Sequence, residues 1–236
     1  MGLLVAIEGG DGAGKATAAA NLVDLVRGAG LSAGLMSFPR YGDTAAGHML
    51  GEFLAGRLPK AMTPRALAVL YALDRYESAY ALAALRAAHD VVVLDRYIAS
   101  NIAYQTAKVP SVERPGLIDW IARLEMVQFG LPAPNLNIYL DTPLEVARAL
   151  ILRKRQRSYT DRSYDEHEAD IALQMRVREV YAALCDDSAV LGPWCTVCTV
   201  REGAMRAPGA IAAEIGEQVL SLTGQRPGPP DIISAT

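Results

Sequence analysis

The sequence predicts a three-layer α/β fold, in which a five-stranded parallel sheet is covered by helices on both faces. Short apolar runs alternate along the chain with segments of helical periodicity, as expected for strand–helix–strand units. The runs at 3–7 and 91–94 are continuously apolar, which is typical of parallel strands buried on both faces. The five expected strands span residues 3–8, 32–38, 90–95, 136–141 and 195–200.

Helices are expected between and after these strands. The segment after the first strand has apolar side chains at mostly helical spacing, and Gly28 and Gly30 end it. A long helix opens at Thr63-Pro64, where threonine is a good N-cap and proline a good first residue. The expected helices lie near residues 15–28, 44–56, 64–88, 98–107, 114–130, 143–153, 165–186 and 208–222.

Composition restricts the possible classes of protein. The chain has 236 residues and 51% hydrophobic content, enough for one sizeable core, and we expect one domain over 1–223. Residues 224–236 contain three prolines and are expected to be a disordered tail. The net charge of −3 provides no global basic field, so no nucleic-acid partner is expected. No apolar run reaches membrane-spanning length and no signal peptide precedes the first strand, so we expect a cytoplasmic protein without a membrane partner.

The three cysteines, Cys185, Cys195 and Cys198, are expected to be reduced thiols in the core. An odd number argues against a disulfide scaffold. Cys195 and Cys198 have the spacing of a redox motif, but they lie in a strand-like run and not before a helix. No second cysteine pair or histidine completes a zinc site around them.

The first strand runs into a motif for binding phosphate. Gly9, Gly14 and Lys15 fit the G-x-x-x-x-G-K frame, between an apolar strand and a helix. Glycines let the backbone curl so that successive N–H groups point at one anion, and the helix N-terminus adds its positive dipole end. The motif predicts the P-loop NTPase fold and an ATP site. Its expected residues are Gly9, Gly10, Asp11, Gly12, Ala13, Gly14, Lys15, Ala16 and Thr17.

One position departs from this motif. The residue after the lysine is usually Ser or Thr, whose hydroxyl binds Mg²⁺, but here it is Ala16. Thr17 comes one residue late, and one residue turns a helical side chain by about 100°. We therefore expect phosphates, water and a carboxylate to hold the Mg²⁺, with Asp11 the nearest carboxylate.

Further charged residues follow other expected strands. In open parallel sheets, ligands bind beyond the carboxyl ends of the strands. Asp95-Arg96 closes the third strand beside the expected phosphate loop, where Arg96 can clamp phosphate oxygens and Asp95 can orient it or hold a metal-bound water. A structural ion pair is the alternative. Arg40, after the second strand, is either an ordinary surface arginine or part of the same site.

Two side-chain pairs lie on helical faces near these strand ends. Tyr71 and Arg75 are four residues apart, so they share a face on which they can stack on a base and hydrogen bond to it. Asn101 and Tyr104, three apart, form a second such pair just after Asp95-Arg96. Ordinary helix packing, with the arginine extending to solvent, is the alternative for both pairs.

A basic stretch at residues 153–162 contains five cations within ten residues. A nucleic-acid patch and a solvated helix end are the alternatives. In a phosphoryl-transfer enzyme this composition suits a lid near 153–164, whose arginines would neutralise charge on the transferred group. Asp165 and Glu168 follow at helical spacing and can bind these arginines or magnesium-bound water.

Together these segments resemble the thymidylate kinases, of the nucleoside monophosphate kinase group, over roughly residues 3–223. The loop alone is generic, whereas the Phe-Pro-Arg-Tyr and Asp-Arg-Tyr elements in this order are specific. The motifs that carry the resemblance are residues 7–15, Phe38-Pro39-Arg40-Tyr41, Leu73-Asp74-Arg75, Asp95-Arg96-Tyr97, Ser100-Asn101 and Tyr104.

The resemblance implies roles at the phosphate end of a substrate site. Lys15 and the loop would hold the donor phosphates, and Arg96 would bridge donor and acceptor phosphates. Arg40 would bind the phosphate of dTMP. Asp11 would contact the 3′ side of the deoxyribose or the shell of the metal. From their position after the basic stretch, Asp165 is assigned to the substrate and Glu168 to Mg²⁺ through water.

The resemblance also implies roles at the base end. Tyr71 would stack on thymine, Arg75 would contact O4 and Asn101 would contact the N3 edge. Tyr104 would pack against the 2′ carbon and disfavour ribonucleotides. Phe38, Pro39 and Tyr41 would complete the pocket.

The resemblance extends to the lid and to assembly. Gly12 stands where some members of the family have an arginine, and members without it resemble the bacterial type, with catalytic arginines in the lid. Arg153 and Arg157 are the candidates here. A homodimer is implied by the family alone.

The expected activity is ATP-dependent phosphorylation of dTMP to dTDP. One alternative is another deoxynucleotide or deoxynucleoside kinase of the same fold. A nucleotide-dependent switch is a second alternative, from a different class of protein.

Overall fold

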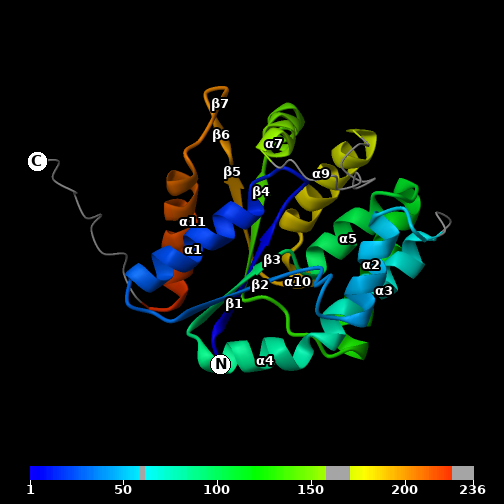
Figure 1. Ribbon diagram of the computed structural model, residues 1–236, viewed down its shortest axis with the longest axis horizontal. Coiled ribbons are helices and arrows are strands. Elements are labelled where there is room, and N and C mark those ends of the chain that lie inside the picture. The colour runs from blue at the N-terminus through cyan, green and yellow to red at the C-terminus, as the bar shows by residue number, and fades with distance from the viewer. Residues whose placement is uncertain (59–61, 158–170, 225–236) are drawn as a thin grey trace, which may run out of the picture.

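A five-stranded parallel sheet forms the centre of the computed structural model, in the order β2-β3-β1-β4-β5 (Figure 1). The structure describes residues 1–58, 62–157 and 171–224, apart from the side chains of 151–157. The expected fold class is confirmed. The strands are β1 Leu3–Glu8, β2 Ala33–Ser37, β3 Val91–Asp95, β4 Leu136–Asp141 and β5 Trp194–Cys198.

The sheet is buried on both faces because apolar residues fill most positions of its central strands. In β1, Leu4 and Ala6 belong to one core cluster, whereas Val5 and Ile7 belong to the other. Strand β3 is paired with β1 in register, with Leu4 opposite Val92. This explains why continuous apolar runs, without alternation, predicted these strands.

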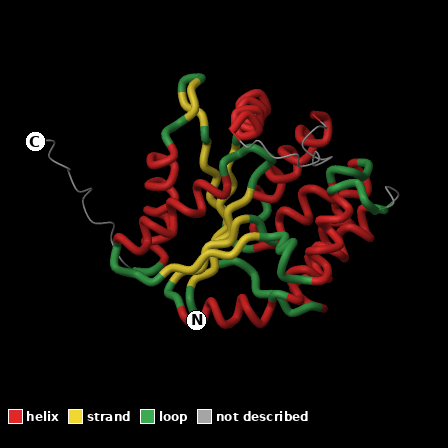
Figure 2. Tube along the Cα trace, viewed as in Figure 1, coloured by secondary structure: helices red, strands yellow, loops and turns green. Residues whose placement is uncertain are grey.

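Two groups of helices cover the two faces (Figures 1 and 2). Helices α1 and α11 supply one core cluster, and α3, α4, α5, α6, α9 and α10 supply the other. Helix α2 packs on α3. The bounds are α1 Lys15–Gly28, α2 Ala45–Leu54, α3 Pro64–Glu77, α4 Ala79–Ala88, α5 Ile98–Thr106, η1 Ser111–Glu113, α6 Arg114–Ala122, η2 Arg123–Gln128, α7 Leu144–Arg157, α9 Ile171–Asp186, α10 Ser188–Leu191 and α11 Pro208–Leu222.

The expected single helix over 64–88 is wrong, because the chain breaks at Ser78 into α3 and α4. The Ser78 hydroxyl donates to the Asp74 carbonyl at 2.8 Å, in competition with the backbone N–H groups for that acceptor. The apolar side chains continue across the break, so periodicity did not reveal it. As a result α3 faces the ligand pocket described below, whereas α4 packs under β2 and β3.

The expected helix over 114–130 is α-helical only as far as Ala122. After α6, the segment η2 widens into a π-helical turn. A wider turn shifts side chains relative to an α-helix. Within this turn Glu125 has no exposed surface.

The last expected strand, 195–200, ends at Cys198, and the chain continues into a separate hairpin of β6 Val200–Arg201 and β7 Ala204–Met205. The three cysteines are free, as expected. Cys195 and Cys198 lie three apart on one strand, so their side chains point to opposite faces. Cys195 is half-buried but Cys198 is exposed, so the expectation of core thiols is wrong for Cys198.

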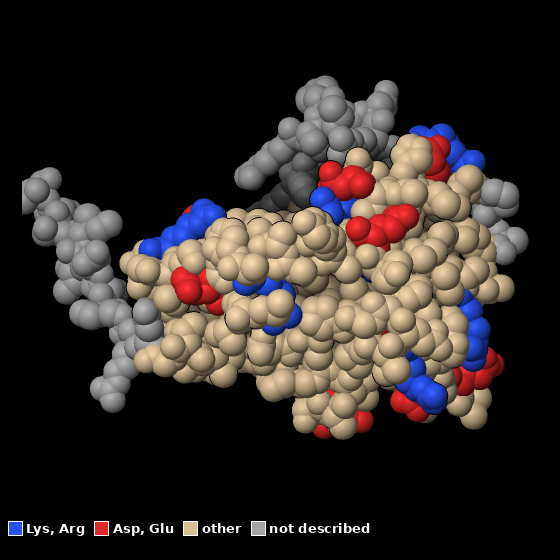
Figure 3. Space-filling view, turned by 90° about the horizontal axis from the view of Figure 1, so that it is seen from below, with Lys and Arg blue, Asp and Glu red and all other residues tan. Residues whose placement is uncertain are grey.

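In the described part of the chain, none of the helices is both long and apolar enough to span a membrane. On the face shown in Figure 3, acidic and basic side chains are scattered around a largely uncharged surface. The expected disordered tail and the expected lid fall largely on residues outside the described parts.

Candidate active site

The phosphate loop occupies residues 9–14, between the end of β1 and the start of α1. Gly9 and Gly14 have φ angles of 149° and 85°, which side chains rarely adopt. A Cβ on Gly9 would also lie 3.0 Å from the Leu140 carbonyl oxygen. The glycines of the motif are therefore required by the backbone, and α1 begins at Lys15 with its free N–H groups facing the loop.

Lys15 is buried, with 6% of its surface exposed, and its Nζ donates to the Gly10 carbonyl at 2.6 Å. Burial lowers the pKa of Lys15 to about 7, and the nearby Arg96 charge acts in the same direction. An anionic ligand at the loop would restore the charged form, because opposite charge raises the pKa of an amine.

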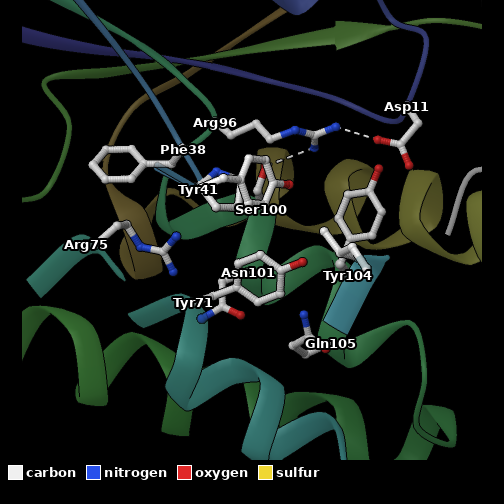
Figure 4. Close-up of a pocket in the computed structure, with 12 residues that line it drawn as sticks. Asp11, Phe38, Tyr41, Tyr71, Arg75, Arg96, Ser100, Asn101, Tyr104 and Gln105 are labelled. Carbon is white, nitrogen blue, oxygen red and sulfur yellow. Dashed lines mark hydrogen bonds and ion pairs between the residues drawn. The ribbon is translucent and has the colours of Figure 1, made fainter. Parts of the chain in front are cut away.

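Arg96 and Asp11 face each other across the pocket and form an ion pair (Figure 4). Arg96 has a positive φ of 67°, and its backbone N–H donates to the Ile7 carbonyl at 3.0 Å. Gln174 of α9 donates from Nε2 to the other Asp11 oxygen at 2.8 Å. Burial opposes ionisation of Asp11, but the charges of Arg96 and Lys15 outweigh it and lower its pKa. The site therefore presents a carboxylate and two potential cations at one point.

Glu8 anchors the turn that carries Arg96. Its carboxylate has no exposed surface and accepts from the Tyr97 N–H at 2.7 Å, the Ser100 hydroxyl at 2.6 Å and the Tyr181 hydroxyl at 2.9 Å. Burial raises the pKa of Glu8, against these hydrogen bonds. Glu8 was not among the predicted site residues, although its place at the end of a buried strand was a signal in the sequence.

A cavity of about 140 Å³ extends from Arg96 between α3 and α5 (Figure 4). It brings together nearly all of the predicted substrate residues. Its lining is Asp11, Phe38, Pro39, Tyr41, Leu54, Tyr71, Arg75, Arg96, Ser100, Asn101, Tyr104 and Gln105. Leu54 and Gln105 were not anticipated, because nothing in the sequence distinguishes them from other helical residues. A second cavity of about 550 Å³ borders the loop at Gly10 and reaches Asp141 and Arg178.

At the far end of the pocket, Arg75 and Asn101 are tied to one buried carboxylate. Arg75 donates to Glu125 from Nε at 2.5 Å and from Nη2 at 2.6 Å, and Asn101 donates from Nδ2 at 2.8 Å. All three residues are at most 2% exposed. Glu125 was not among the predicted site residues, because an isolated glutamate in a helical segment carries no signal of burial.

Arg40 does not line this cavity. Its Nη1 donates to the Ser78 hydroxyl at 3.2 Å, and its Nη2 lies 3.2 Å from an Asp43 oxygen. Its backbone N–H donates to the Asp74 carboxylate at 3.1 Å, which fixes the turn after β2. A role for Arg40 at the acceptor phosphate stays a prediction that requires its side chain to leave Asp43.

The structure describes the predicted residues of the loop but not the side chains of the predicted residues of the lid. Ala16 and Thr17 are exposed in the first turn of α1. Arg153 and Arg157 fall within α7, but their side chains lie outside the described structure, as do Asp165 and Glu168. Their assignments stay predictions.

Comparison with known proteins decides the family. The family model described as thymidylate kinase matches residues 7–192. The chain belongs to the thymidylate kinase family.

Relatives in the thymidylate kinase family match most of the chain. A thymidylate kinase of Mycobacterium tuberculosis is 38% identical over 216 residues, which cover 90% of this chain and 97% of the relative. One of Thermomicrobium roseum is 31% identical over 227 residues, with 88% and 100% covered. The solved thymidylate kinase of Candida albicans has a TM-score of 0.66 at 21% identity, covering 94% of this chain and 92% of that one, and it supports the fold.

Proposed function

We propose that this chain transfers the γ-phosphoryl group of ATP to dTMP, giving dTDP. One observation carries the proposal: a single pocket joins the hydrogen-bonding residues Arg75 and Asn101 to Arg96 and Asp11 beside the phosphate loop. Tyr71 lines the pocket between these ends and supplies an aromatic face for a base. A nucleotide lying along the pocket would place its phosphate near Arg96.

For this reaction the protein must position the two substrates and neutralise the charge of their phosphates. A phosphate oxygen of dTMP is already anionic, so its attack on the γ-phosphorus needs no strong base. Lys15 and Arg96 would neutralise the charge that spreads over the transferred group. Asp11 holds Arg96 in place, and Glu8 holds the turn from which Arg96 extends.

A coupled assay with a panel of nucleoside monophosphates tests this function. We expect dTMP to give the highest kcat/KM and thymidine to give none, because a nucleoside lacks the phosphate that Arg96 would bind. Thymidine phosphorylation would instead support a deoxynucleoside kinase. ATP binding with no acceptor activity would support a switch. A homodimer stays an expectation from the family resemblance, and a cytoplasmic location stays an expectation from the sequence.

Magnesium fits this site through carboxylates and water. Asp95 Oδ1 is buried and has no hydrogen-bond partner within the described residues, and Asp11 is anionic at the loop. Ala16 has no oxygen on its side chain, so the usual hydroxyl ligand is missing. Asp95 and Asp11 would hold the metal, directly or through water, and the ion would supply charge at the phosphates.

Replacing Ala16 with serine should lower the Mg²⁺ concentration needed for half-maximal activity severalfold. The new hydroxyl would stand at the position that ligates Mg²⁺ in most phosphate loops. Titration of activity with Mg²⁺ at saturating nucleotides measures the effect, and Thr17→Ala is the matched control. An unchanged Mg²⁺ requirement in Ala16→Ser would count against a missing ligand.

Replacing Tyr104 with alanine should reduce the preference for dTMP over its ribonucleotide by about tenfold, since small steric differences are worth 10- to 200-fold. Tyr104 is buried in the pocket, with the Arg96 guanidinium 5.4 Å from its ring centroid. The ratio of the two kcat/KM values measures the effect. Tyr80→Ala, at an exposed position of α4, is the control. Equal discrimination in wild type and Tyr104→Ala would reject the assigned role.

A further inference from the structure

Glu125 is a buried carboxylate that the proposed reaction does not use. It has no exposed surface, it lies in the π-helical turn η2, and its oxygens do not line the pocket. Three hydrogen bonds from Arg75 and Asn101 converge on it. A charge this deeply buried requires such partners, so Glu125, Arg75 and Asn101 form one unit.

The hydrogen bonds fix which way the Asn101 amide points. Its nitrogen lies 3.0 Å from the Ala68 carbonyl oxygen and 2.8 Å from Glu125 Oε1. Both partners only accept hydrogen bonds, so the atom facing them must be the NH₂ group. Asn101 Oδ1 is then left as a buried acceptor with no partner among the described residues, in a side chain that lines the pocket.

Glu125 also fixes the orientation of the Arg75 guanidinium. Glu125 engages Nε and Nη2, so Nη1 is the guanidinium nitrogen that Glu125 leaves for another acceptor. The pocket wall therefore carries an acceptor from Asn101 and a donor from Arg75. A pyrimidine with N3–H and a 4-oxo group matches this pattern. Cytosine, with an unprotonated N3 and a 4-amino group, opposes it at both atoms.

We propose that Glu125 is the positioning residue that fixes this donor–acceptor polarity and so excludes cytosine nucleotides from the pocket. The inference rests on the proposed function, which places a pyrimidine base against Arg75 and Asn101. Glu125 acts through those two side chains and does not touch the base.

The variant Glu125→Gln tests the proposal, because an amide has one accepting oxygen where Glu125 uses two. Oε1 accepts from both Asn101 Nδ2 and Arg75 Nη2, and Oε2 accepts from Arg75 Nε. With its oxygen at the Oε1 position, the amide turns its NH₂ group toward the Nε–H of Arg75; with its oxygen at the Oε2 position, it turns that group toward the NH₂ of Asn101. In either orientation two donors face each other, so Arg75 or Asn101 must shift. We expect the ratio of kcat/KM for dTMP over dCMP to fall at least about tenfold, within the range for polar groups left unpaired. The ratio of kcat/KM for dTMP over dUMP should stay within about twofold of its wild-type value, because both bases share the N3–O4 edge.

Glu8→Gln is the matched control. Glu8 is equally buried and accepts three hydrogen bonds, but it lies beside Ser100 and Tyr97 at the phosphate end. Its replacement should lower turnover with every base and leave the dTMP-to-dCMP ratio as in wild type. A folded Glu125→Gln with an unchanged ratio would overturn the proposal, whatever its turnover.

A measurement on the wild-type chain covers the case in which Glu125→Gln does not fold. The side-chain amide protons of Asn101, observed by ¹⁵N NMR, should exchange slowly both before and after dTMP binds. Rapid exchange in either state would overturn the proposal. Failure of the wild type to phosphorylate dTMP would overturn the proposed function, whereas activity on dTMP with an unaltered base ratio in Glu125→Gln would overturn this inference alone.

Discussion

Arg96→Ala is expected to lower kcat by about a thousandfold or more, since one arginine at the transferred group contributes three to five powers of ten. Arg96 is the cation that reaches both the loop, through Asp11, and the pocket that would hold the acceptor. Steady-state kinetics at saturating dTMP and ATP measure the loss. Thermal unfolding shows whether the variant is folded. We expect it to be folded, because Asp11 would keep its hydrogen bond from Gln174.

The control for this variant is Arg86→Ala. The Arg86 side chain donates to the Gly2 carbonyl. Arg86 belongs to α4, a helix that lies beside the N-terminus of the chain and away from the start of α1 (Figure 1). Its replacement should leave turnover close to that of wild type. Turnover of Arg96→Ala within a fewfold of wild type would remove Arg96 from the mechanism.

Lys15→Met should lower turnover by at least about a hundredfold, comparable with the loss of one preorganised donor to the transition state. The same lysine should make ATP binding depend on pH. With its pKa lowered to about 7 by burial, Lys15 is mostly neutral at pH 8 and must gain a proton when phosphates bind. ATP affinity should therefore fall as pH rises above 7 and level off below it.

Calorimetry in two buffers of different ionisation enthalpy measures that proton. At pH 8 the wild type should take up close to one proton with ATP, and Lys15→Met should take up correspondingly fewer. At pH 6 the two should agree, because Lys15 is already charged in the free protein. Equal uptake by both proteins at pH 8 would show that Lys15 does not titrate in this range.

The sheet and the phosphate loop were predictable because their signals are local. The apolar runs of β1 and β3 reflect burial on both faces, and the spacing of Gly9, Gly14 and Lys15 reflects the geometry around one anion. Only the family resemblance predicted that one pocket would be lined by Tyr71, Arg75, Asn101 and Tyr104. From helical spacing alone, these pairs were equally compatible with packing.

The supporting contacts could not be predicted because they join residues far apart in sequence. Gln174 reaches Asp11 across 163 positions, and Glu125 reaches Arg75 across 50. Neither residue differs in type from the exposed glutamates and glutamines of other helices. The break at Ser78 was missed for a different reason, because the Ser78 hydroxyl bonds locally to the Asp74 carbonyl while the apolar pattern continues past it.

Titration of dTMP into the wild-type chain without ATP tests the central claim most directly, namely that one preformed pocket joins a thymine site to the phosphate loop. Saturable binding of dTMP is predicted, with dCMP weaker by at least about tenfold and thymidine weakened by loss of its phosphate. Equal binding of dTMP and dCMP, or no dTMP binding until ATP is added, would contradict it.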